Sequence, residues 1–273
     1  MYNIGIVGFG FVGQAVCNAF NSEAWVIDPL ILNNNISDFY DENRDGDHLD
    51  IVFICVPTPM LKDGAIDASI VHKCVQVLLE NTGATIVIKS TVVPNQIPVD
   101  DRVVYNPEFL TEANAMEDFI NAKLHILGGG HKHCHILMKA YNEQSIIKNK
   151  DNFIFMTKTE ASLVKYGINS FLATKITFFN QLYDLVNKHN GSYDNVLKAM
   201  LHDDRISSGH TAVADNGRKR GFGGACLPKD VNALYNFSDR EFSLLQIITN
   251  INNKYRSGYL TDEREQSNNI KFD

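Results

Sequence analysis

The sequence predicts an α/β fold, in which a doubly wound parallel sheet is followed by a mainly helical second domain with one long helix. Short apolar runs that are typical of strands alternate with helical segments as far as about residue 156. From residue 157 onward, apolar residues recur at helical spacing instead. We therefore expect a sheet domain at 1–156, a helical domain at 157–257 and a polar tail at 258–273 that frays.

The expected strands are short and apolar, and the run at 50–56 is apolar almost throughout, which is typical of a strand buried on both faces. Strands are expected at 3–7, 25–28, 50–56, 85–89, 102–105, 123–127 and 152–155, and helices at 12–21 and 67–80. Asp67 is the expected N-cap of the second of these helices.

The second domain is expected to hold helices at 159–189, 192–201, 229–237 and 242–256. Nine apolar residues at helical spacing predict that the first of them is one long helix, buried along more than one face. They are Leu163, Val164, Ile168, Phe171, Leu172, Ile176, Phe179, Leu182 and Leu185.

Composition and charge argue against several classes of protein. The 273 residues are 44% hydrophobic, which suffices for a full core and about two domains. A net charge of -7 argues against broad binding to nucleic acid or to an anionic membrane, but permits a local anion site. We expect no signal peptide and no membrane span, because no basic start precedes an apolar run and no apolar segment reaches about 18 residues.

The five cysteines are odd in number and none has metal-ligand spacing, so neither a disulfide framework nor a structural zinc site is expected. Cys17, Cys55 and Cys74 lie in apolar runs, as small buried side chains do. The nine histidines show no convincing ligand spacing either, so no metal is predicted. These features are typical of a protein of the reducing cytoplasm.

A Gly-x-Gly-x-x-Gly pattern at residues 8–13 lies between the first expected strand and the first helix. In a dinucleotide site, Gly8 permits the tight turn, Gly10 lets the pyrophosphate approach the backbone, and Gly13 lets the helix pack closely. Alone, the pattern fits a turn without a ligand equally well. The surrounding strand and helix favour a Rossmann-type nucleotide site.

The start of this helix and the end of the next strand complete the pattern. Phe11 and Val12 stand where helix N–H groups can meet phosphates. Asp28 follows Gly8 by 20 residues, where a carboxylate can accept from ribose hydroxyls and repel a 2′-phosphate. We therefore expect NAD rather than NADP, and find no context for FAD.

Residues 221–230 read Gly-Phe-Gly-Gly-Ala-Cys-Leu-Pro-Lys-Asp. Glycine N–H groups can hold an oxyanion, and a nearby cation or helix start favours the thiolate of a cysteine. Cys226 is therefore a candidate nucleophile, with Asp230 able to orient a water or Lys165. A buried cysteine beside a turn is the alternative.

This loop resembles the catalytic cysteine loop of the UDP-glucose dehydrogenase and GDP-mannose dehydrogenase family. Five further motifs match in the family's order, and the resemblance covers about residues 1–256. These motifs are Gly8-Phe-Gly-Phe-Val-Gly13, Val52-Phe-Ile-Cys-Val-Pro-Thr-Pro59, Lys89-Ser-Thr-Val-Val-Pro94, Asn106-Pro-Glu-Phe-Leu-Thr-Glu112 and Lys165-Tyr-Gly-Ile-Asn169.

The resemblance implies roles around the cofactor. Thr58, Thr91 and Lys229 would contact NAD, and Thr91 would also help to hold a catalytic water. Glu112 would be a general base or hold the water, next to the cofactor and the sugar.

The resemblance also implies roles at the substrate. Residues 108–112 would form a loop over the sugar and its phosphates, Glu108 lying near the base and the backbones of Phe109 and Leu110 making contacts. Lys165 and Asn169, which share one helix face, would stabilise oxyanions on the sugar carbon. Phe222, Gly223 and the stretch 215–219 would contact the substrate. Without the family, these polar residues would be read as exposed loop or helix side chains.

The family chemistry is a four-electron oxidation of a sugar alcohol to a carboxylate in two hydride steps. Cys226 would hold the aldehyde as a thiohemiacetal, which a second hydride transfer converts to a thioester, and water would release the acid. The resemblance implies acidic polysaccharide precursors as products and a homodimer formed through the long helix.

The chain departs from the family's pattern at three places, one of which is Thr111, where an arginine or alanine is common. We expect no third, nucleotide-binding domain after the helix at 242–256, which leaves recognition of the base open. The stretch 210–220 replaces the usual proline-glycine run, and its basic residues, among them Lys219 and Arg220, could meet the substrate diphosphate or form a solvated loop.

Four functions therefore compete. The leading one is a UDP-glucose 6-dehydrogenase, followed by a dehydrogenase of GDP-mannose or of a UDP-N-acetyl-hexosamine. A catalytically idle NAD-binding protein is the third, and intact Cys226, Lys165, Asn169, Glu112 and Asp230 argue against it. A two-electron hydroxyacid dehydrogenase is the fourth, and its chemistry needs no cysteine in this loop.

Overall fold

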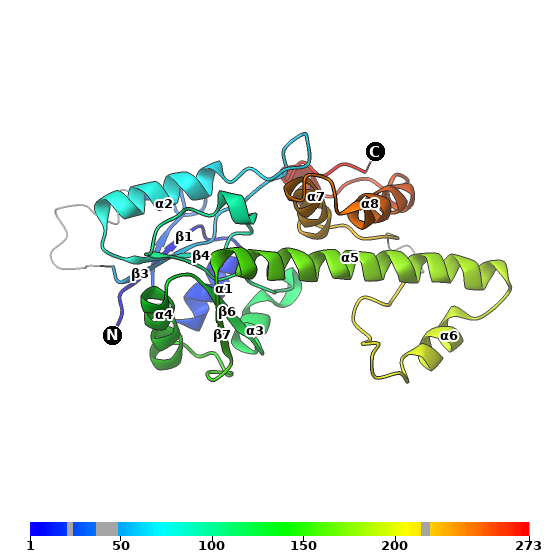
Figure 1. Cartoon of the computed structure of the whole chain (residues 1–273), viewed down its shortest axis with the longest axis horizontal. Helices are drawn as coiled ribbons and strands as arrows, with labels where there is room; N and C mark the ends of the chain where they lie inside the picture. Colours follow the sequence, from blue (N-terminus) through cyan, green and yellow to red (C-terminus); the bar gives the residue numbers. More distant parts are fainter. Residues whose placement is uncertain (21–23, 37–48, 214–218, 273) are drawn as a thin grey trace. The chain divides into compact units, whose positions relative to one another are not determined.

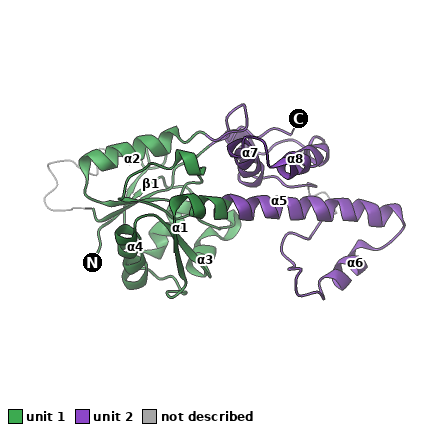
Figure 2. Ribbon diagram, in the orientation of Figure 1, with its two compact units in different colours: residues 1–58, 67–165 green, residues 59–66, 166–273 purple. Residues whose placement is uncertain are grey.

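A computed structural model describes residues 1–273 except 21–23, 37–48, 214–218 and 273. The chain divides into two compact units, the first made of residues 1–58 and 67–165 and the second of 59–66 and 166–273 (Figure 2). The expected boundary at residues 156–157 lies just before the long helix, which begins inside unit 1 and continues into unit 2. The predicted substrate contacts at 215–218 fall outside the described residues.

Unit 1 is built on a seven-stranded sheet in the order β2-β1-β3-β4-β5-β6-β7 (Figure 1). The strands are β1 (Ile4–Val7), β2 (Trp25–Ile27), β3 (Ile51–Ile54), β4 (Thr85–Ile88), β5 (Val103–Tyr105), β6 (His125–Gly128) and β7 (Phe153–Met156). Every residue of β1, β3, β4, β5 and β6 is buried, as expected for central strands covered on both faces.

The sequence suggested a sheet that is parallel throughout, but one pair of neighbouring strands is antiparallel. β6 pairs with β5 in antiparallel fashion through Tyr105 and Gly128, whereas the other neighbours are parallel. Short apolar runs carry no mark of strand direction, so only the path of the chain through α3 (Ala115–Ile120) determines it.

Helices cover both faces of this sheet. One layer contains α1 (Phe11–Ala19), α3 and α4 (His131–Gln144), whose apolar residues join the main core, and α2 (Ser69–Asn81) lies on the other side (Figure 1). The N-cap of α2 is Ala68 rather than Asp67. Asp67 nevertheless accepts the Ser69 N–H at 2.9 Å, so it satisfies a donor of the first turn from one position earlier.

The order of the strands reverses between β1 and β3, because the chain leaves β1 toward β2 and then returns to the other side of β1. In open α/β sheets, ligands bind beyond the carboxyl ends of the strands at such a reversal. The glycine turn at 8–13 follows β1 directly, so the fold places it at this position.

The long helix α5 (Lys158–Lys188) is continuous over 31 residues, as predicted. Its predicted burial is wrong in part: of the nine apolar residues, Phe171 is 66% and Leu185 54% exposed, and so is Phe178 between them at 53%. Small and polar residues such as Ala173 and Thr177 fill the buried face. Helical spacing reveals that a helix has an apolar stripe but not whether the same chain covers it.

Unit 2 continues with α6 (Tyr193–Met200), α7 (Leu227–Phe237), α8 (Ser243–Arg256) and α9 (Glu263–Ser267). The tail does not fray: α9 is one more helix, and Ile270 and Phe272 are buried against Met60. A single fully buried carboxylate, Glu265, ties this segment to the rest of unit 2.

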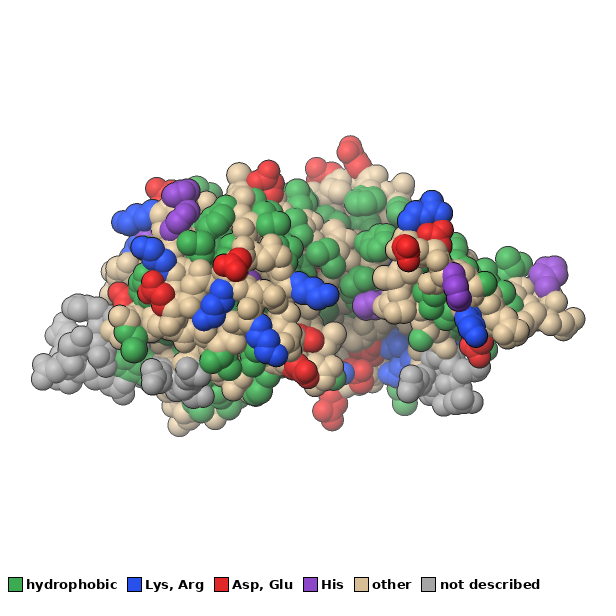
Figure 3. Space-filling model, turned by 90° about the horizontal axis from the view of Figure 1, so that it is seen from below, with side chains coloured by type: hydrophobic (Ala, Val, Ile, Leu, Met, Phe, Trp, Pro, Cys, Tyr) green, Lys and Arg blue, Asp and Glu red, His purple; other side chains and the backbone are tan. Residues whose placement is uncertain are grey.

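No described helix is both long enough and apolar enough to cross a membrane. On the face drawn in Figure 3, basic and acidic side chains are interspersed among the described residues.

Candidate functional site

The glycine turn of unit 1 has the geometry that a dinucleotide site requires. Gly8 adopts φ +93°, and a Cβ there would lie 2.7 Å from the Cys55 carbonyl oxygen. A Cβ on Gly13 would lie 2.0 Å from the Gly8 carbonyl oxygen, so α1 can approach the turn only with glycine at this position. A Cβ on Gly10, the N-cap of α1, would meet nothing within 4 Å.

The space beside Gly10 opens at the start of α1, where Phe11 and Val12 form the first turn and no side chain caps the helix. Helix N–H groups at such an end attract phosphate. The two crowded glycines shape the turn and the uncrowded one faces open space, which fits a pyrophosphate held against the backbone.

Asp28 lies at the end of β2 and joins the turn to the loop that follows it. Its Oδ2 accepts the Phe9 N–H at 2.7 Å, and its Oδ1 accepts the N–H groups of Leu30 and Ile31, both at 2.9 Å. The carboxylate is thereby held next to the glycine turn as predicted, and its remaining lone pairs are available for ribose hydroxyls.

The two predicted threonines lie together in unit 1. Thr58 donates its hydroxyl to the Thr91 carbonyl oxygen at 3.0 Å, and Ser90 donates to the Val56 carbonyl oxygen at 2.6 Å. These bonds join the segments that follow β3 and β4, on the same edge of the sheet as the glycine turn.

A buried ion pair follows β5. Lys165 donates to the Glu108 carbonyl oxygen at 2.7 Å and lies 3.1 Å from its Oε1, and both side chains are less than a tenth exposed. Glu108 Oε2 accepts the Leu110 N–H at 2.6 Å, and Lys165 lies 5.5 Å from the centre of the Phe109 ring. Four of the predicted residues are therefore brought together, whereas Glu112 is exposed at the start of a 3-10 turn.

Sequence reasoning assigned no role to Lys89 and Asn106, which are buried beside this pair. Lys89 donates to Asn106 Oδ1 at 3.0 Å, and the same oxygen accepts the Tyr141 hydroxyl at 2.8 Å. Burial lowers the pKa of Lys89 to about 8, a shift that Cys55 and Glu108 partly oppose. The sequence did contain a signal for them: each is a polar residue that directly follows an apolar strand run, at the start of Lys89-Ser-Thr and of Asn106-Pro-Glu.

Unit 2 holds the cysteine loop. Cys226 is exposed and forms the N-cap of α7, in contrast to Cys17, Cys74 and Cys134, which are buried. A thiol at a helix N-terminus is in a position that favours its thiolate form. Burial raises the pKa of Cys55 to about 12 and makes it a poor nucleophile.

A buried polar chain supports the loop from the first turn of α7. Asp230, 1% exposed, accepts from Asn169 Nδ2 at 2.6 Å and from Lys229 Nζ at 2.5 Å. Three predicted catalytic or cofactor-binding residues thus form one network within unit 2. Asn169 stands one helical turn after Lys165 on α5, as its spacing predicted.

The residues just before the cysteine are bound within the protein. Phe222 is 2% exposed, and its backbone exchanges two hydrogen bonds with the Asn252 side chain at 2.7 and 2.9 Å. Asn252 was not identified from the sequence, because it lies about 30 residues away on α8 in an ordinary polar helix context.

The two basic residues predicted to meet a diphosphate have internal partners. Arg220 bonds to Asp184 Oδ1 at 2.6 Å and to the Asn180 carbonyl oxygen at 2.8 Å, and Lys219 donates to the Leu260 carbonyl oxygen at 2.6 Å. These contacts give both side chains a structural role, and their contact with substrate stays a prediction.

No group of three or more His, Cys, Asp or Glu side chains with the geometry of a metal site occurs in the described part of the chain.

Two family models match the chain, and together they cover most of it. The NAD binding domain of the UDP-glucose/GDP-mannose dehydrogenase family matches residues 26–145, and the central domain of the same family matches residues 159–254. Asp28 lies within the first match, and the cofactor is NAD.

Individual proteins agree with the family models. A UDP-glucose 6-dehydrogenase of Rickettsia bellii is 35% identical over 240 residues, which are 82% of this chain and 53% of that protein. The structure of a UDP-glucose dehydrogenase from Pyrobaculum islandicum has a TM-score of 0.76 at 25% identity and covers 93% of this chain and 68% of its own. A UDP-D-ManNAc dehydrogenase from Pyrococcus horikoshii has the same fold, with a TM-score of 0.76 at 19% identity over 98% of this chain and 73% of its own.

The chain spans about half the length of the curated relatives it matches. The central-domain match contains the cysteine loop, whereas the glycine turn at residues 8–13 lies ahead of the NAD binding domain match. The sheet order, the glycine turn, the cysteine loop and both family models lead to one conclusion, that this chain belongs to the UDP-glucose/GDP-mannose dehydrogenase family.

Proposed function

We propose that the protein catalyses the NAD-dependent oxidation of a nucleotide sugar, specifically of UDP-glucose to UDP-glucuronate, with Cys226 as the nucleophile. The observation that carries the proposal is the position of this thiol: it is exposed at the N-terminus of α7, one turn before a buried carboxylate that binds Asn169 and Lys229. The relatives named UDP-glucose 6-dehydrogenase support the choice of substrate.

NAD supplies the hydride acceptor, and two equivalents are needed to oxidise a primary alcohol to a carboxylate. Gly8, Gly10 and Gly13 would hold its pyrophosphate at the start of α1, and Asp28 its adenosine ribose. Thr58 and Thr91 would contact it from the ends of the neighbouring strands, and Lys229 from α7.

The cysteine makes the second oxidation possible at the same site. The Cys226 sulfur adds to the aldehyde carbon, and the aldehyde oxygen takes up a proton to give a thiohemiacetal. The thiohemiacetal carbon would then lose hydride to a second NAD and its hydroxyl group a proton to a base, which leaves a thioester. Water then adds to the thioester carbon, the carbon–sulfur bond breaks, and the carboxylate and the thiol are released.

Cations and amides stabilise the negative oxygen that develops at each stage. Lys165 and Asn169 are the proposed donors, and each such donor is worth about 3–4 kcal/mol in well-studied sites. In this chain both are oriented by carboxylates, Lys165 by Glu108 and Asn169 by Asp230.

A carboxylate must also accept protons from the attacking water. Glu112 is the proposed base or water-holding group, together with Thr91, and its exposed position at the end of the 108–112 loop leaves it accessible to solvent. Phe109, Leu110, Phe222, Gly223, Lys219 and Arg220 are the proposed substrate contacts.

Association of two copies through α5 is part of the proposal. Phe171, Phe178 and Leu185 follow one another at intervals of seven residues, which places them in one stripe along the helix, and all three are more than half exposed. A repeated stripe of this kind is suited to pack against its own copy in a dimer with twofold symmetry.

The test is to supply a panel of nucleotide sugars with NAD and to count NADH formed per sugar consumed. We expect two NADH per UDP-glucose and an acidic product. One NADH per sugar would instead indicate a two-electron dehydrogenase, two NADH with GDP-mannose or a UDP-N-acetyl-hexosamine only would change the substrate, and no NADH with any sugar would leave a protein that only binds NAD.

Cys226→Ser tests the covalent step. The variant should bind NAD and UDP-glucose with affinities within about threefold of the parent but form no acid, since serine oxygen is a much weaker nucleophile at neutral pH. Cys74→Ser, a change of the same kind in α2, is the control and should keep full acid production. Acid production by Cys226→Ser at the parent rate would remove the thiol from the mechanism.

A further inference from the structure

The C-terminal segment, residues 257–272, contains the short helix α9, whose first turn is capped by side chains of the segment itself. Asp262 accepts the N–H groups of Arg264 and Glu265 at 3.1 and 2.9 Å, and Glu265 Oε2 returns a bond by accepting the Asp262 N–H at 3.0 Å. This reciprocal cap orients the Glu265 side chain away from solvent, and the residue is 0% exposed.

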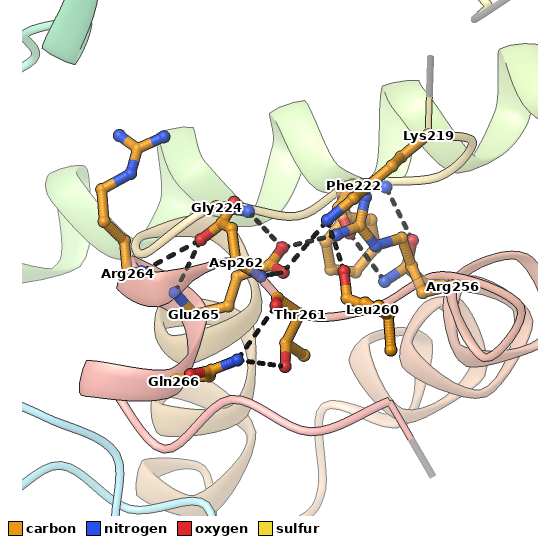
Figure 4. Close-up of polar contacts among 11 residues, drawn as sticks. Lys219, Phe222, Gly224, Arg256, Leu260, Thr261, Asp262, Arg264, Glu265 and Gln266 are labelled. Atoms are coloured by element: carbon orange, nitrogen blue, oxygen red, sulfur yellow. Dashed lines mark hydrogen bonds and ion pairs between the residues drawn. The ribbon is translucent and has the colours of Figure 1, made fainter. Parts of the chain in front are cut away.

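The other oxygen of the same carboxylate reaches the cysteine loop (Figure 4). Glu265 Oε1 accepts the Gly224 N–H at 2.9 Å and Arg256 Nη2 at 2.5 Å. Lys219, which precedes the loop, lies 3.8 Å from Oε2. One carboxylate therefore joins the cap of α9, the last residue of α8 and the backbone two residues before Cys226.

Gly223 shows how closely the loop fits this ion pair. A Cβ at Gly223 would lie 2.6 Å from Glu265 Oε1 and 2.7 Å from Arg256 Cζ. Gly224 adopts φ +76°, which favours glycine, while a Cβ there would meet nothing within 4 Å. The first glycine is thus needed for the approach of the pair, and the second for the turn toward Cys226.

The remainder of the segment keeps the pair in place. Arg256 is 4% exposed, and the Phe272 ring covers its guanidinium at 4.7 Å. Phe272 packs in turn with Ile270 and Met60, and Asn269 donates to the Met60 carbonyl oxygen at 2.9 Å. A buried pair held from several sides has one arrangement, so it can fix the backbone to which it bonds.

We infer that Glu265 is a positioning residue for Cys226: the C-terminal segment braces the cysteine loop through the Glu265–Gly224 and Glu265–Arg256 contacts and thereby sets the reactivity of the thiol. The effect on catalysis rests on the proposed function, whereas the effect on the thiol does not. The test therefore measures the thiol directly.

The probe is iodoacetamide, with carbamidomethylation of each cysteine followed by peptide mass spectrometry between pH 6 and 10 on the intact protein at 20 °C. Cys226 is exposed, whereas Cys17, Cys74 and Cys134 are buried. Slow labelling of the three buried thiols shows that a variant is folded, and the rate at Cys226 then reports on the loop alone.

Glu265→Ala removes every contact of the carboxylate. We expect its Cys226 labelling rate at pH 7.5 to differ at least fivefold from the parent and the midpoint of its pH profile to move. Glu263→Ala on the same short helix is the matched control, because Glu263 is exposed, and its profile should coincide with that of the parent.

Glu265→Gln distinguishes an effect of Glu265 on the cysteine loop from a general loss of stability. The amide oxygen can keep the Gly224 and Arg256 bonds, while the amide nitrogen replaces the oxygen that faces the Asp262 N–H and Lys219. This variant should lose thermal stability because its cap is weakened, yet label at Cys226 within twofold of the parent. A purely structural role would move both quantities together.

A folded Glu265→Ala variant with the parent's Cys226 profile would overturn the inference. If this variant labels at all cysteines and is therefore unfolded, Gly223→Ala decides instead, because its methyl group displaces the same pair, and an unchanged profile there would equally overturn it. In turnover with UDP-glucose and NAD, Glu265→Ala should lower kcat at least fivefold and leave the KM for NAD within twofold. Absence of turnover in the parent would refute the proposed function alone, since the labelling comparison stands without it.

Discussion

At the scale of single residues, two glycines of the same turn, Gly13 and Gly10, differ in what surrounds them. Gly13 is required by packing, because any side chain there would overlap the Gly8 carbonyl oxygen. Gly10 faces open space, so packing does not require the absence of a side chain there, whereas the proposed pyrophosphate contact would. A side chain at Gly13 should therefore affect stability, whereas one at Gly10 should affect NAD binding.

Gly10→Ala should leave the protein as stable as the parent, to within about 1 kcal/mol as for ordinary surface substitutions, but weaken NAD binding at least tenfold. Gly13→Ala should lower thermal stability strongly, since its Cβ would lie 2.0 Å from a backbone atom. Thermal unfolding and titration with NAD measure the two effects. Equal losses of stability in both variants would contradict the assignment.

Asp28 orients the turn and is also the proposed ribose ligand. Asp28→Ala should weaken NAD binding by about 10- to 100-fold, because hydrogen bonds to a charged group contribute about 1.5–3 kcal/mol. Asp50→Ala is the control: Asp50 likewise accepts a backbone N–H, from Asn3 at 2.8 Å, at the opposite end of the sheet. Calorimetric titration of both variants with NAD should separate them, and unchanged affinity in Asp28→Ala would refute the ribose contact.

At the scale of elements, α5 combines two functions in one helix. Its buried face carries Lys165 and Asn169, whose polar groups are satisfied by Glu108 and Asp230. Its exposed face carries large apolar side chains that a soluble chain seldom leaves in water as a continuous stripe.

Phe171→Glu combined with Phe178→Glu should convert a dimer to a monomer, because two carboxylates would have to be buried at the proposed interface. The control is Asn187→Glu. Asn187 is exposed on the same helix, and at about 100° per residue it points to nearly the opposite side from Leu185, so this variant should leave the dimer intact. Sedimentation equilibrium of the three proteins measures this. A parent that sediments as a monomer at micromolar concentration would rule out the proposed interface.

At the scale of the whole molecule, global stability depends on polar groups that the sheet domain buries. His125 on β6 is 7% exposed and stacks against Phe153 at 5.0 Å and Tyr141 at 5.6 Å, and its Nε2 has no hydrogen-bond partner among the described residues. Burial, aided by the charge of Lys89, lowers its pKa from 6.5 to about 4.

This shift makes folding less favourable as the pH falls through the window from 6.5 to 4. In that window the unfolded chain binds a proton at His125 and the folded chain does not, which costs about 1.4 kcal/mol for each unit of pKa difference. His125→Phe should therefore unfold with a shallower dependence on pH than the parent between pH 6.5 and 4.

The control is His202→Phe, because His202 is exposed on the chain that follows α6. Urea unfolding of the three proteins at several pH values measures the difference. The same slope in the parent and in His125→Phe would show that this histidine is protonated in the folded state as easily as in the unfolded one.

The sequence by itself determined the local features of this protein. The strands, most helices, the glycine turn, the long helix and the candidate residues of the cysteine loop could be predicted, because periodicity, turn chemistry and motifs depend on neighbouring residues. The two family models confirm the family to which these motifs pointed. The order of the motifs carried more information than the composition.

Only the tertiary structure decided which distant residues meet. It showed that β6 runs against β5, that the apolar stripe of α5 is exposed, and that the C-terminal segment folds back so that Glu265 lies 2.9 Å from the Gly224 nitrogen. The physical reason is that burial and pairing depend on contacts between segments remote in the chain. The sequence led us to expect a frayed tail at 258–273, and nothing in it indicated the capping box at Asp262 and Glu265 or that this glutamate would hold the loop of Cys226.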